Sequence, residues 1–285
     1  KYFTDICLAY DEIERLKGFC VVKADGLAAG KGVSVCDSVK SAKFACDEIL
    51  RDKKFGESGK KLLIEERIEG QEASLFVVSD GNNYQLVGTA QDHKRAFDGN
   101  KGPNTGGMGA ISPAPNLNTK LTQEILNKII SPTIKGMKEE NRPYEGILYA
   151  GIMLTKDGPK LIEYNCRFGD PEAQVLLPLL ETDIIEIILK SINKSIKNFN
   201  VHIKKKNAIT VVLASRGYPG KFKKNIKLPE LYPPENQEIL KIFHAGTNLN
   251  HNKELVATGG RVLSITAISK TISDCRKRAY DQLKK

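Results

Sequence analysis

The sequence predicts an α+β protein built from three successive regions, at residues 1–80, 81–205 and 206–285. Short runs rich in β-branched residues alternate along the chain with stretches in which apolar residues recur at helical spacing. The 285 residues are enough for two or more domains, and the hydrophobic content of 40% is ordinary for a globular protein.

The first region is expected to fold as a small α+β unit. A glycine-rich loop at residues 26–32 interrupts an apolar strand pattern, and Ser38 precedes apolar and small residues at helical spacing. Because serine is a favoured N-cap residue, we expect a helix to begin after Ser38. Strands are expected at residues 19–23, 32–36, 62–66, 73–79 and 85–90, the last two joined by a turn at Asp80-Gly81.

The second and third regions contain a long loop, helices and further strands. The loop at residues 98–115 is rich in Gly, Asn and Pro, and a loop of this length is usually functional. Helical spacing follows at residues 122–138, and the third region begins near Asn207, after a run of three lysines. Strands are expected at residues 146–154, 160–164, 208–214 and 261–267, and a helix from Ser273 closes the chain.

Composition argues against membrane, secreted and nucleic-acid-binding proteins. No run approaches the roughly 20 apolar residues of a membrane-spanning helix, and the first ten residues lack the apolar segment of a signal peptide. The six cysteines form no CxxC pair, which favours reduced thiols in the cytoplasm. The net charge of +10 suits anionic small molecules. The basic residues are spread rather than striped beside aromatics, so we expect no nucleic-acid partner.

The first candidate site is a strand lysine followed by a loop of glycines and small residues. Glycines allow backbone N–H groups to converge on phosphate oxygens, and two lysines supply charge. The spacing is not that of a Walker A loop. A phosphate-binding loop is therefore predicted, with a flexible turn between two strands as the alternative; the residues are Lys23, Gly26, Gly30, Lys31 and Gly32.

The second candidate site lies where an apolar strand ends in a charged segment. Glu65 and the backbone amide of Ile68 offer the acceptor and donor that suit an adenine edge, and Glu72 is able to accept from ribose hydroxyls. The alternative is a solvated, charged turn.

The third candidate site combines a polar segment at residues 91–95 with a loop at residues 99–109 that contains five glycines. Ordering so many glycines costs entropy, so the loop should do something that larger residues would prevent. Backbone amides are expected to bind an anion, with Lys94 or Arg95 as the countercharge. A mobile surface loop is the alternative.

The fourth candidate site is a strand carrying Glu163, Asn165 and Arg167 at alternate positions. A carboxylate and an amide oxygen on one strand face form a hard-oxygen site for Mg²⁺, and the arginine would neutralise a phosphoryl group. Asp170 and Pro171 are expected to be the N-cap and first residue of a helix. An edge strand with a solvated polar face is the alternative.

Together these motifs resemble the ATP-grasp ligases and, within them, the glycinamide ribonucleotide synthetases. Four segments carry the resemblance, at residues 23–33, 92–110, 163–172 and 243–247. It implies an ATP-grasp fold, with a small lid subdomain at residues 1–80 and a larger mixed-sheet subdomain at residues 81–205. A small C-terminal α/β domain would occupy residues 206–285.

The resemblance also implies the reaction and its residues. ATP would phosphorylate glycine, and 5-phosphoribosylamine would attack the acyl phosphate to give glycinamide ribonucleotide, ADP and phosphate. Lys23 and the loop residues would hold the phosphates, Glu65 and Ile68 the adenine, and Glu72 the ribose. Mg²⁺, or Mn²⁺ in its place, would be held by Glu163 and Asn165. Asp92 and Arg167 would face the glycine and the acyl phosphate, and Lys23 would act with them in catalysis.

The sequence departs from the family pattern in two respects. First, the resemblance implies that the family's Rossmann-like N-terminal domain is lacking and that its usual C-terminal end lies beyond Lys285. Second, many relatives have a second metal carboxylate on the strand before Glu163, where residues 148–153 contain no acid. The resemblance also allows fusion to other purine-pathway enzymes. The alternatives are a nucleotide-binding fragment without catalysis and another ATP-grasp ligase, such as a carboxylase subunit acting on bicarbonate.

Overall fold

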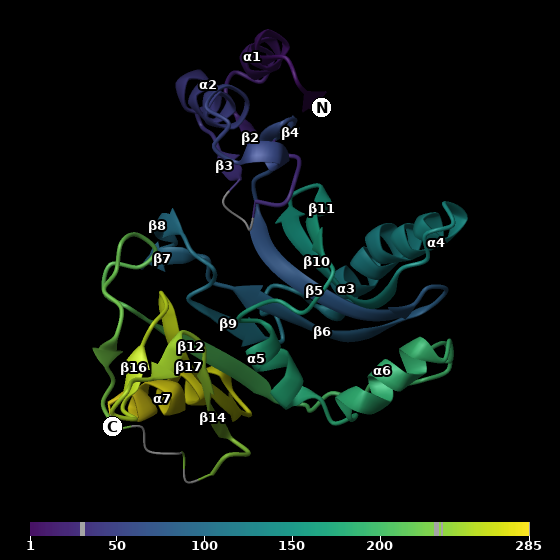
Figure 1. Cartoon of the computed structure of the whole chain (residues 1–285). Helices are drawn as coiled ribbons and strands as arrows, with labels where there is room; N and C mark the ends of the chain where they lie inside the picture. The colour runs from purple at the N-terminus through teal and green to yellow at the C-terminus, as the bar shows by residue number, and fades with distance from the viewer. Residues whose placement is uncertain (29–31, 231–233, 235, 285) are drawn as a thin grey trace. The chain divides into compact units, whose positions relative to one another are not determined.

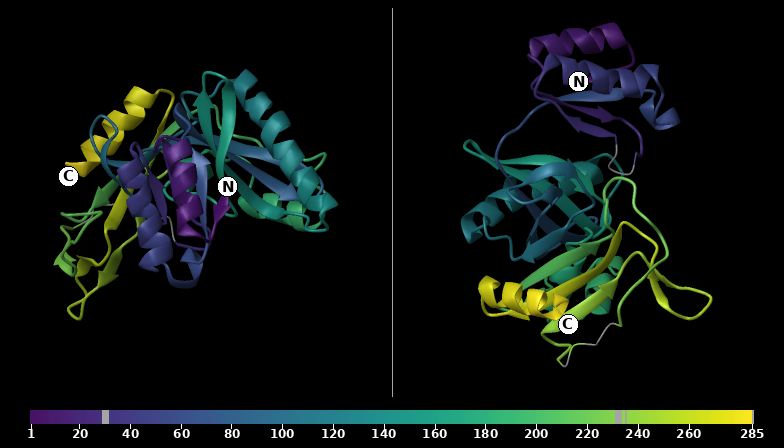
Figure 2. Two further views of the ribbon diagram at one scale, coloured as in Figure 1. Left: turned by 90° about the horizontal axis from the view of Figure 1, so that it is seen from above. Right: turned by 90° about the vertical axis from the view of Figure 1, so that its left-hand side faces the viewer.

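The computed structural model describes residues 1–28, 32–230, 234 and 236–284. The chain divides into two compact units, Lys1–Glu69 and Gly70–Lys285, which are coloured purple to blue and blue to yellow in Figures 1 and 2. Each unit has its own sheet and its own apolar core. Two predicted site residues, Gly30 and Lys31, lie outside the described residues.

The first unit is a four-stranded antiparallel sheet with helices packed against it. The strand order is β1-β4-β2-β3. Ala9 and Ile13 of one helix and Ala42 and Ala45 of the other are buried with the sheet residues in one core. The elements are β1 (Tyr2–Phe3), α1 (Ile6–Arg15), β2 (Cys20–Ala24), β3 (Val33–Val35), α2 (Val39–Cys46), the π-helical turn η1 (Asp47–Arg51), the 3₁₀ turn η2 (Gly56–Gly59) and β4 (Leu62–Glu66).

Both helices of this unit begin at side-chain caps. The Asp5 carboxylate accepts from the backbone N–H groups of Cys7 and Leu8, and Ser38 Oγ accepts from Ser41 N at 3.3 Å. These bonds satisfy amides that have no partner within the helix. The helix start predicted at Ser38 is confirmed.

The second unit is organised by one eight-stranded sheet. Its order is β11-β10-β5-β6-β9-β12-β17-β14. Every neighbouring pair is antiparallel, so the expected mixed sheet is wrong in this respect. Short turns join β5 to β6 and β10 to β11, and such turns impose antiparallel pairing. The strands are β5 (Gln71–Asp80), β6 (Tyr84–Asp92), β9 (Gly109–Ser112), β10 (Glu145–Thr155), β11 (Gly158–Asn165), β12 (Asn207–Ala214), β14 (Leu240–His244) and β17 (Arg261–Ser269).

Helices cover both faces of the β5–β10 part of this sheet. Residues alternate along β5, so that Phe76 and Val78 belong to one core cluster while Leu75 and Val77 belong to another. The first cluster includes Ile187 of a helix on one face, and the second includes Ile134 of a helix on the other (Figure 1). The helical segments are α3 (Thr119–Ile125), η3 (Leu126–Ile130), α4 (Ser131–Glu139), α5 (Ala173–Leu176), η4 (Leu177–Leu179) and α6 (Ile184–Ile192).

The C-terminal part adds a helix and a small sheet. Helix α7 (Ile272–Leu283) buries Cys275 and Ala279 against β12 and β17. A three-stranded sheet, in the order β13-β16-β15, is formed by β13 (Ile226–Lys227), β16 (Leu255–Ala257) and β15 (Thr247–Leu249). No helix among the described residues is long and apolar enough to cross a membrane.

The long loop expected at residues 98–115 contains regular structure. Strands β7 (Arg95–Phe97) and β8 (Lys101–Asn104) form a hairpin, and β9 joins the eight-stranded sheet. Asn100 and Gly99 take positive φ angles of 57° and 70° at the hairpin turn, a conformation that these residue types tolerate. The loop composition therefore marks a turn flanked by two short strands.

Candidate functional site

The candidate residues of the first unit lie on adjacent strands. Lys23 on β2 forms an ion pair with Glu65 on β4, and the lysine side chain is only 16% exposed. Ile68 follows β4 and is half-buried. The carboxylate expected to meet adenine is therefore also the ion-pair partner of the lysine expected to bind phosphate.

The described part of the glycine-rich loop is tied to its surroundings at both ends. Gly26 N donates to the carbonyl of Ser58 at 3.0 Å, and Ser58 Oγ donates to the carbonyl of Leu27 at 2.8 Å. At the other end, Ala24 N donates to the carbonyl of Gly32 at 2.8 Å. These bonds fix where the loop leaves and rejoins the sheet.

In the second unit, Glu72 and Lys94 form an ion pair of 2.9 Å. Burial acts to lower the pKa of Lys94, but the carboxylates of Glu72, Asp92 and Glu163 outweigh it and raise the pKa above its usual value. Lys94 thus carries a positive charge in the middle of three candidate carboxylates. Glu72, which is expected to accept from the ribose hydroxyls, therefore has Lys94 as its ion-pair partner.

Asp92 ends β6, and its carboxyl group lies in an unusual environment. Oδ1 is buried and has no hydrogen-bond partner among the described residues. The pKa of Asp92 is raised to about 7, first by burial and then by the nearby Glu172 carboxylate, and Lys94 acts in the opposite direction. Glu172 itself is only 2% exposed. A buried acceptor without a donor suits a cationic N–H group.

The glycine-rich segment at residues 104–109 packs closely against this carboxyl group. Gly107 has a φ of +103°, and a Cβ atom at this position would lie 2.8 Å from Asp92 Oδ1 and 2.4 Å from Pro171 Cδ. Any larger residue would therefore strain the backbone and collide with Pro171 and with the carboxyl oxygen of Asp92. The expectation that this segment contains glycine to avoid obstruction is consistent with this geometry.

Glu163 and Asn165 lie side by side near the end of β11. Asn165 Nδ2 donates to Glu163 Oε1 at 3.3 Å, which leaves the amide oxygen and the second carboxylate oxygen available. Within the described residues, no group of three or more His, Cys, Asp and Glu side chains is placed to hold a metal ion. The pair fits a hard cation only if the nucleotide phosphates supply further oxygen ligands, as Mg²⁺ sites commonly require.

Arg167 is not on the strand face expected for it. Strand β11 ends at Asn165, and Arg167 lies in the following bend, where Nη1 donates to the carbonyl of Phe168 at 2.9 Å. Phe168 in turn stacks on Phe76, with ring centroids 6.1 Å apart. The exposed guanidinium of Arg167 is therefore held near the end of β11. It does not share a strand face with Glu163 and Asn165, although the sequence pattern predicted this.

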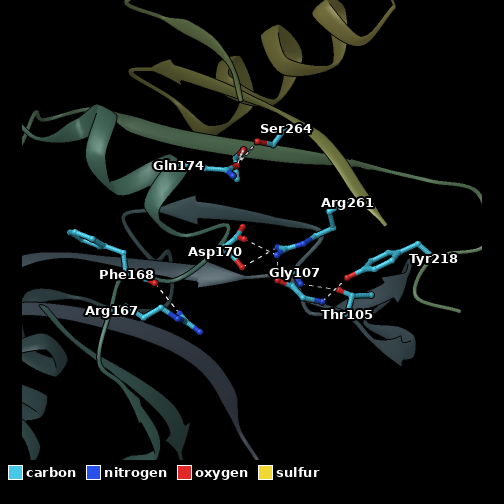
Figure 3. A network of polar contacts seen from close by, with 11 residues as sticks. Thr105, Gly107, Arg167, Phe168, Asp170, Gln174, Tyr218, Arg261 and Ser264 are labelled. Carbon is cyan, nitrogen blue, oxygen red and sulfur yellow. Dashed lines mark hydrogen bonds and ion pairs between the residues drawn. The ribbon is translucent and has the colours of Figure 1, made fainter. Parts of the chain in front are cut away.

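The expected N-cap at Asp170 is wrong, because this carboxylate has another partner. Helix α5 begins at Ala173 and has no side-chain cap, whereas Asp170 Oδ2 accepts from Arg261 Nη2 at 2.8 Å (Figure 3). Arg261 and Tyr218 also bond to the backbone of Gly106, and neither residue was identified from the sequence. The available signal was a pair of glycines immediately before the arginine that begins β17.

Comparison with family models matches almost all of the chain. The phosphoribosylglycinamide synthetase ATP-grasp (A) domain matches residues 1–173, and the C domain of the same synthetase matches residues 208–285. The chain therefore has the ATP-grasp fold that its motifs suggested, followed by a C domain.

Curated relatives extend beyond the region that they share with this chain. A phosphoribosylamine–glycine ligase from Leptospira interrogans is 46% identical over 93% of the chain and 62% of its own length. The chloroplastic enzyme of Arabidopsis thaliana is 45% identical over 98% of the chain and 53% of its own length. A trifunctional purine biosynthetic protein from Gallus gallus is 47% identical over 91% of the chain and 26% of its own length. The chain thus spans about three fifths or less of these relatives.

Solved structures agree with this assignment of the fold. A phosphoribosylamine–glycine ligase from Thermotoga maritima superposes with a TM-score of 0.89 at 31% identity, covering 100% of this chain and 70% of that one. The biotin carboxylase domain of a 2-oxoglutarate carboxylase from Hydrogenobacter thermophilus, bound to MgADP and bicarbonate, superposes with a TM-score of 0.74 at 16% identity, covering 98% and 59%. The second likeness shows the fold alone.

Proposed function

Because the chain belongs to the phosphoribosylglycinamide synthetase family, we propose that it joins glycine to 5-phosphoribosylamine at the expense of ATP, a step of de novo purine biosynthesis. The products are glycinamide ribonucleotide, ADP and phosphate. The structural observation that supports this most directly is the buried oxygen of Asp92 beside Gly107, which has no hydrogen-bond partner in the described part of the chain and so suits the ammonium group of a small amino acid.

The nucleotide is assigned mainly to the first unit. Lys23 binds phosphate oxygens together with the loop residues Gly26, Gly30, Lys31 and Gly32, while Glu65 and Ile68 recognise the adenine. Glu72 accepts from the ribose hydroxyls. The ion pair between Lys23 and Glu65 supports this assignment, because it fixes the orientation of the lysine side chain that is proposed to bind the phosphates.

The divalent cation is assigned to Glu163 and Asn165. Mg²⁺, with Mn²⁺ as a substitute, supplies charge neutralisation at the phosphates when it is bound. The hard oxygen atoms of this neighbouring pair support the choice of metal. A relative of the same fold is bound to MgADP, and we extend that metal preference to this chain by analogy.

The chemistry begins with glycine held at Asp92. The glycine carboxylate attacks the γ-phosphorus of ATP, the bond to the bridging oxygen breaks, and glycyl phosphate and ADP result. The amine of 5-phosphoribosylamine then attacks the glycyl carbonyl carbon, phosphate leaves, and the new amide nitrogen loses a proton. Arg167 and Lys23 stabilise the negative charge on the transferring phosphoryl group.

The remaining assignments follow from the chain as a whole. All six cysteines are free, which supports a reducing compartment such as the cytoplasm. The C-domain match to residues 208–285 supports the domain proposed at residues 206–285. The lid was expected at 1–80 and the core at 81–205, but the first compact unit ends earlier, at Glu69, because β5 belongs to the large sheet. As in the trifunctional relative, the parent polypeptide could join this region to other purine enzymes.

The test is multiple-turnover release of ADP by the chain with ATP, Mg²⁺ and the two substrates glycine and 5-phosphoribosylamine. We expect ADP formation that requires both substrates and is reduced in Asp92→Asn. Binding of MgATP without turnover would instead support the nucleotide-binding alternative. ADP release with bicarbonate in place of glycine would support a carboxylase-type ligase.

A further inference from the structure

Arg261, the first residue of β17, bonds to two separate segments of the candidate site (Figure 3). Its Nη1 donates to the carbonyl of Gly106 at 2.6 Å and to the carbonyl of Asp170 at 3.0 Å, and its Nη2 donates to Asp170 Oδ2 at 2.8 Å. The side chain is 21% exposed. A guanidinium with three such bonds is a rigid fork, a geometry that a lysine ammonium does not reproduce.

Gly106 is held from both sides. While its carbonyl accepts from Arg261, its N–H donates to the hydroxyl oxygen of Tyr218 at 2.9 Å. Thr105 Oγ1 then accepts from Gly107 N at 3.0 Å and donates to the carbonyl of Lys94 at 2.8 Å. The peptide groups around Gly106 and Gly107 therefore have fixed orientations.

Each segment bonded by Arg261 continues into a residue that lies beside Asp92. Gly106 precedes Gly107, and Asp170 precedes Pro171. A Cβ atom on Gly107 would lie 2.8 Å from Asp92 Oδ1 and 2.4 Å from Pro171 Cδ, so these three residues meet at one point. The guanidinium of Arg261, which bonds to both Gly106 and Asp170, therefore connects the two segments that carry Gly107 and Pro171.

The backbone around Arg261 is itself fixed by close packing of glycines. A Cβ atom on Gly246 would lie only 2.5 Å from Gly259 Cα, and Gly246 N donates to the carbonyl of Arg261 at 2.9 Å. Ser215 N donates to the carbonyl of Gly260 at 2.8 Å. The segment at residues 243–247, which contributed to the family resemblance, thus acts as a support for Arg261.

We propose that Arg261 and Tyr218 are positioning residues that hold Gly107 and Pro171 against Asp92 and thereby set the affinity for glycine. This inference rests on the proposed function for its choice of ligand. Neither residue contacts the reacting atoms in this assignment; they act through Gly106 and Asp170. Because Gly107 and Pro171 pack tightly beside Asp92, the same contacts disfavour an amino acid that carries a side chain there.

The first arm of the experiment needs no catalysis. Amide hydrogen exchange of residues 104–109 is compared by mass spectrometry in the wild-type chain, Arg261→Lys and Tyr218→Phe, without ligands. We expect exchange of this segment to rise about tenfold in both variants, since each loses a bond to Gly106. Arg142→Lys and Tyr280→Phe, at exposed positions of the same unit, are the matched controls and should leave exchange unchanged. Unchanged exchange in Arg261→Lys and Tyr218→Phe would overturn the positioning role.

The second arm measures steady-state kinetics of ADP release. We expect the KM for glycine to rise about tenfold in Arg261→Lys, with the KM for ATP unchanged and L-alanine used relatively better than by the wild type. A raised exchange rate with an unchanged KM for glycine would overturn the link to glycine. A wild-type chain without ligase turnover would count against the proposed function, and the exchange arm would still decide whether Arg261 and Tyr218 position the segment. Circular dichroism melting of each variant checks that it is folded, and the conservative Tyr218→Phe keeps the test valid if Arg261→Lys is unstable.

Discussion

Replacing Asp92 with asparagine should make the protein more stable at neutral and alkaline pH. The carboxyl group has its pKa raised from 3.8 to about 7, first by burial and then by Glu172. A raised pKa means that the folded state holds the proton more tightly than the unfolded state does. Ionisation of this group therefore opposes folding, and the wild type loses stability as pH rises from about 4 to about 7.

The size of this effect follows from the pKa shift. Three units, at about 1.4 kcal/mol per unit, give at most about 4 kcal/mol above pH 7. The half-buried position of Asp92 allows some solvent screening, which lowers the value towards about 2 kcal/mol. Near pH 4 the carboxyl group is protonated in the folded state and about half ionised in the unfolded state, so the stability difference between Asp92→Asn and the wild type should be much smaller there.

The assay is urea unfolding of both proteins near pH 4 and near pH 8, followed by circular dichroism. Titrating groups that do not interact with Asp92 cancel in the comparison, whereas the effects of Glu172 and Lys94 on Asp92 are already part of its raised pKa. Asp98→Asn, at an exposed carboxylate of the β7–β8 hairpin, is the control and should show no pH-dependent gain. An equal stability difference between Asp92→Asn and the wild type at the two pH values would refute the reasoning.

Three further substitutions test other parts of the structure. Glu163→Gln should reduce Mg²⁺-dependent ADP release more than about tenfold, because it removes the charged member of the Glu163–Asn165 pair, and should leave the circular dichroism spectrum unchanged. Near-normal turnover at limiting Mg²⁺ would reject the assignment of Glu163 as a metal ligand. Lys23→Ala should weaken ATP binding about tenfold in calorimetry, whereas the control Lys40→Ala, at an exposed position, should bind ATP as the wild type does. Equal ATP affinities of Lys23→Ala and the wild type would show that Lys23 does not bind phosphate. Asp5→Ala should cost about 1 kcal/mol in thermal unfolding through loss of the cap on α1, whereas the exposed Asp11→Ala should cost much less.

Much of the fold was predictable because local patterns determine it. Ser38 marks the start of α2, and the alternating apolar residues of β5 and the long apolar run of β10 mark sheet strands. The antiparallel order of the large sheet was not predictable in the same way. β9 pairs with β12, whose residues lie almost a hundred positions further along the chain, and no local pattern specifies such a pairing.

In the candidate site, too, residues in local patterns were predictable and contacts between distant parts of the chain were not. Glu163 and Asn165 were found because they alternate on a strand, and Asp92 because it opens a distinctive segment. The partners of Asp170 were missed because a carboxylate before proline has the pattern of a helix cap, while its actual partner, Arg261, lies 91 residues away. Arg167 was misplaced because β11 ends two residues before it, at a boundary that sequence patterns locate poorly.

The four residues of β9 have a practical consequence for dissecting the protein. Ala110 pairs with Asp92 on one side and with Thr210 on the other, so β9 joins the two halves of a single hydrogen-bonded sheet. Cutting the chain before Asn207 would leave the far side of β9 as an uncovered edge, with backbone donors and acceptors open to pairing with other molecules. Such edges template aggregation. Expression of the candidate site as an isolated fragment should therefore retain the chain at least through Ser269, where β17 ends.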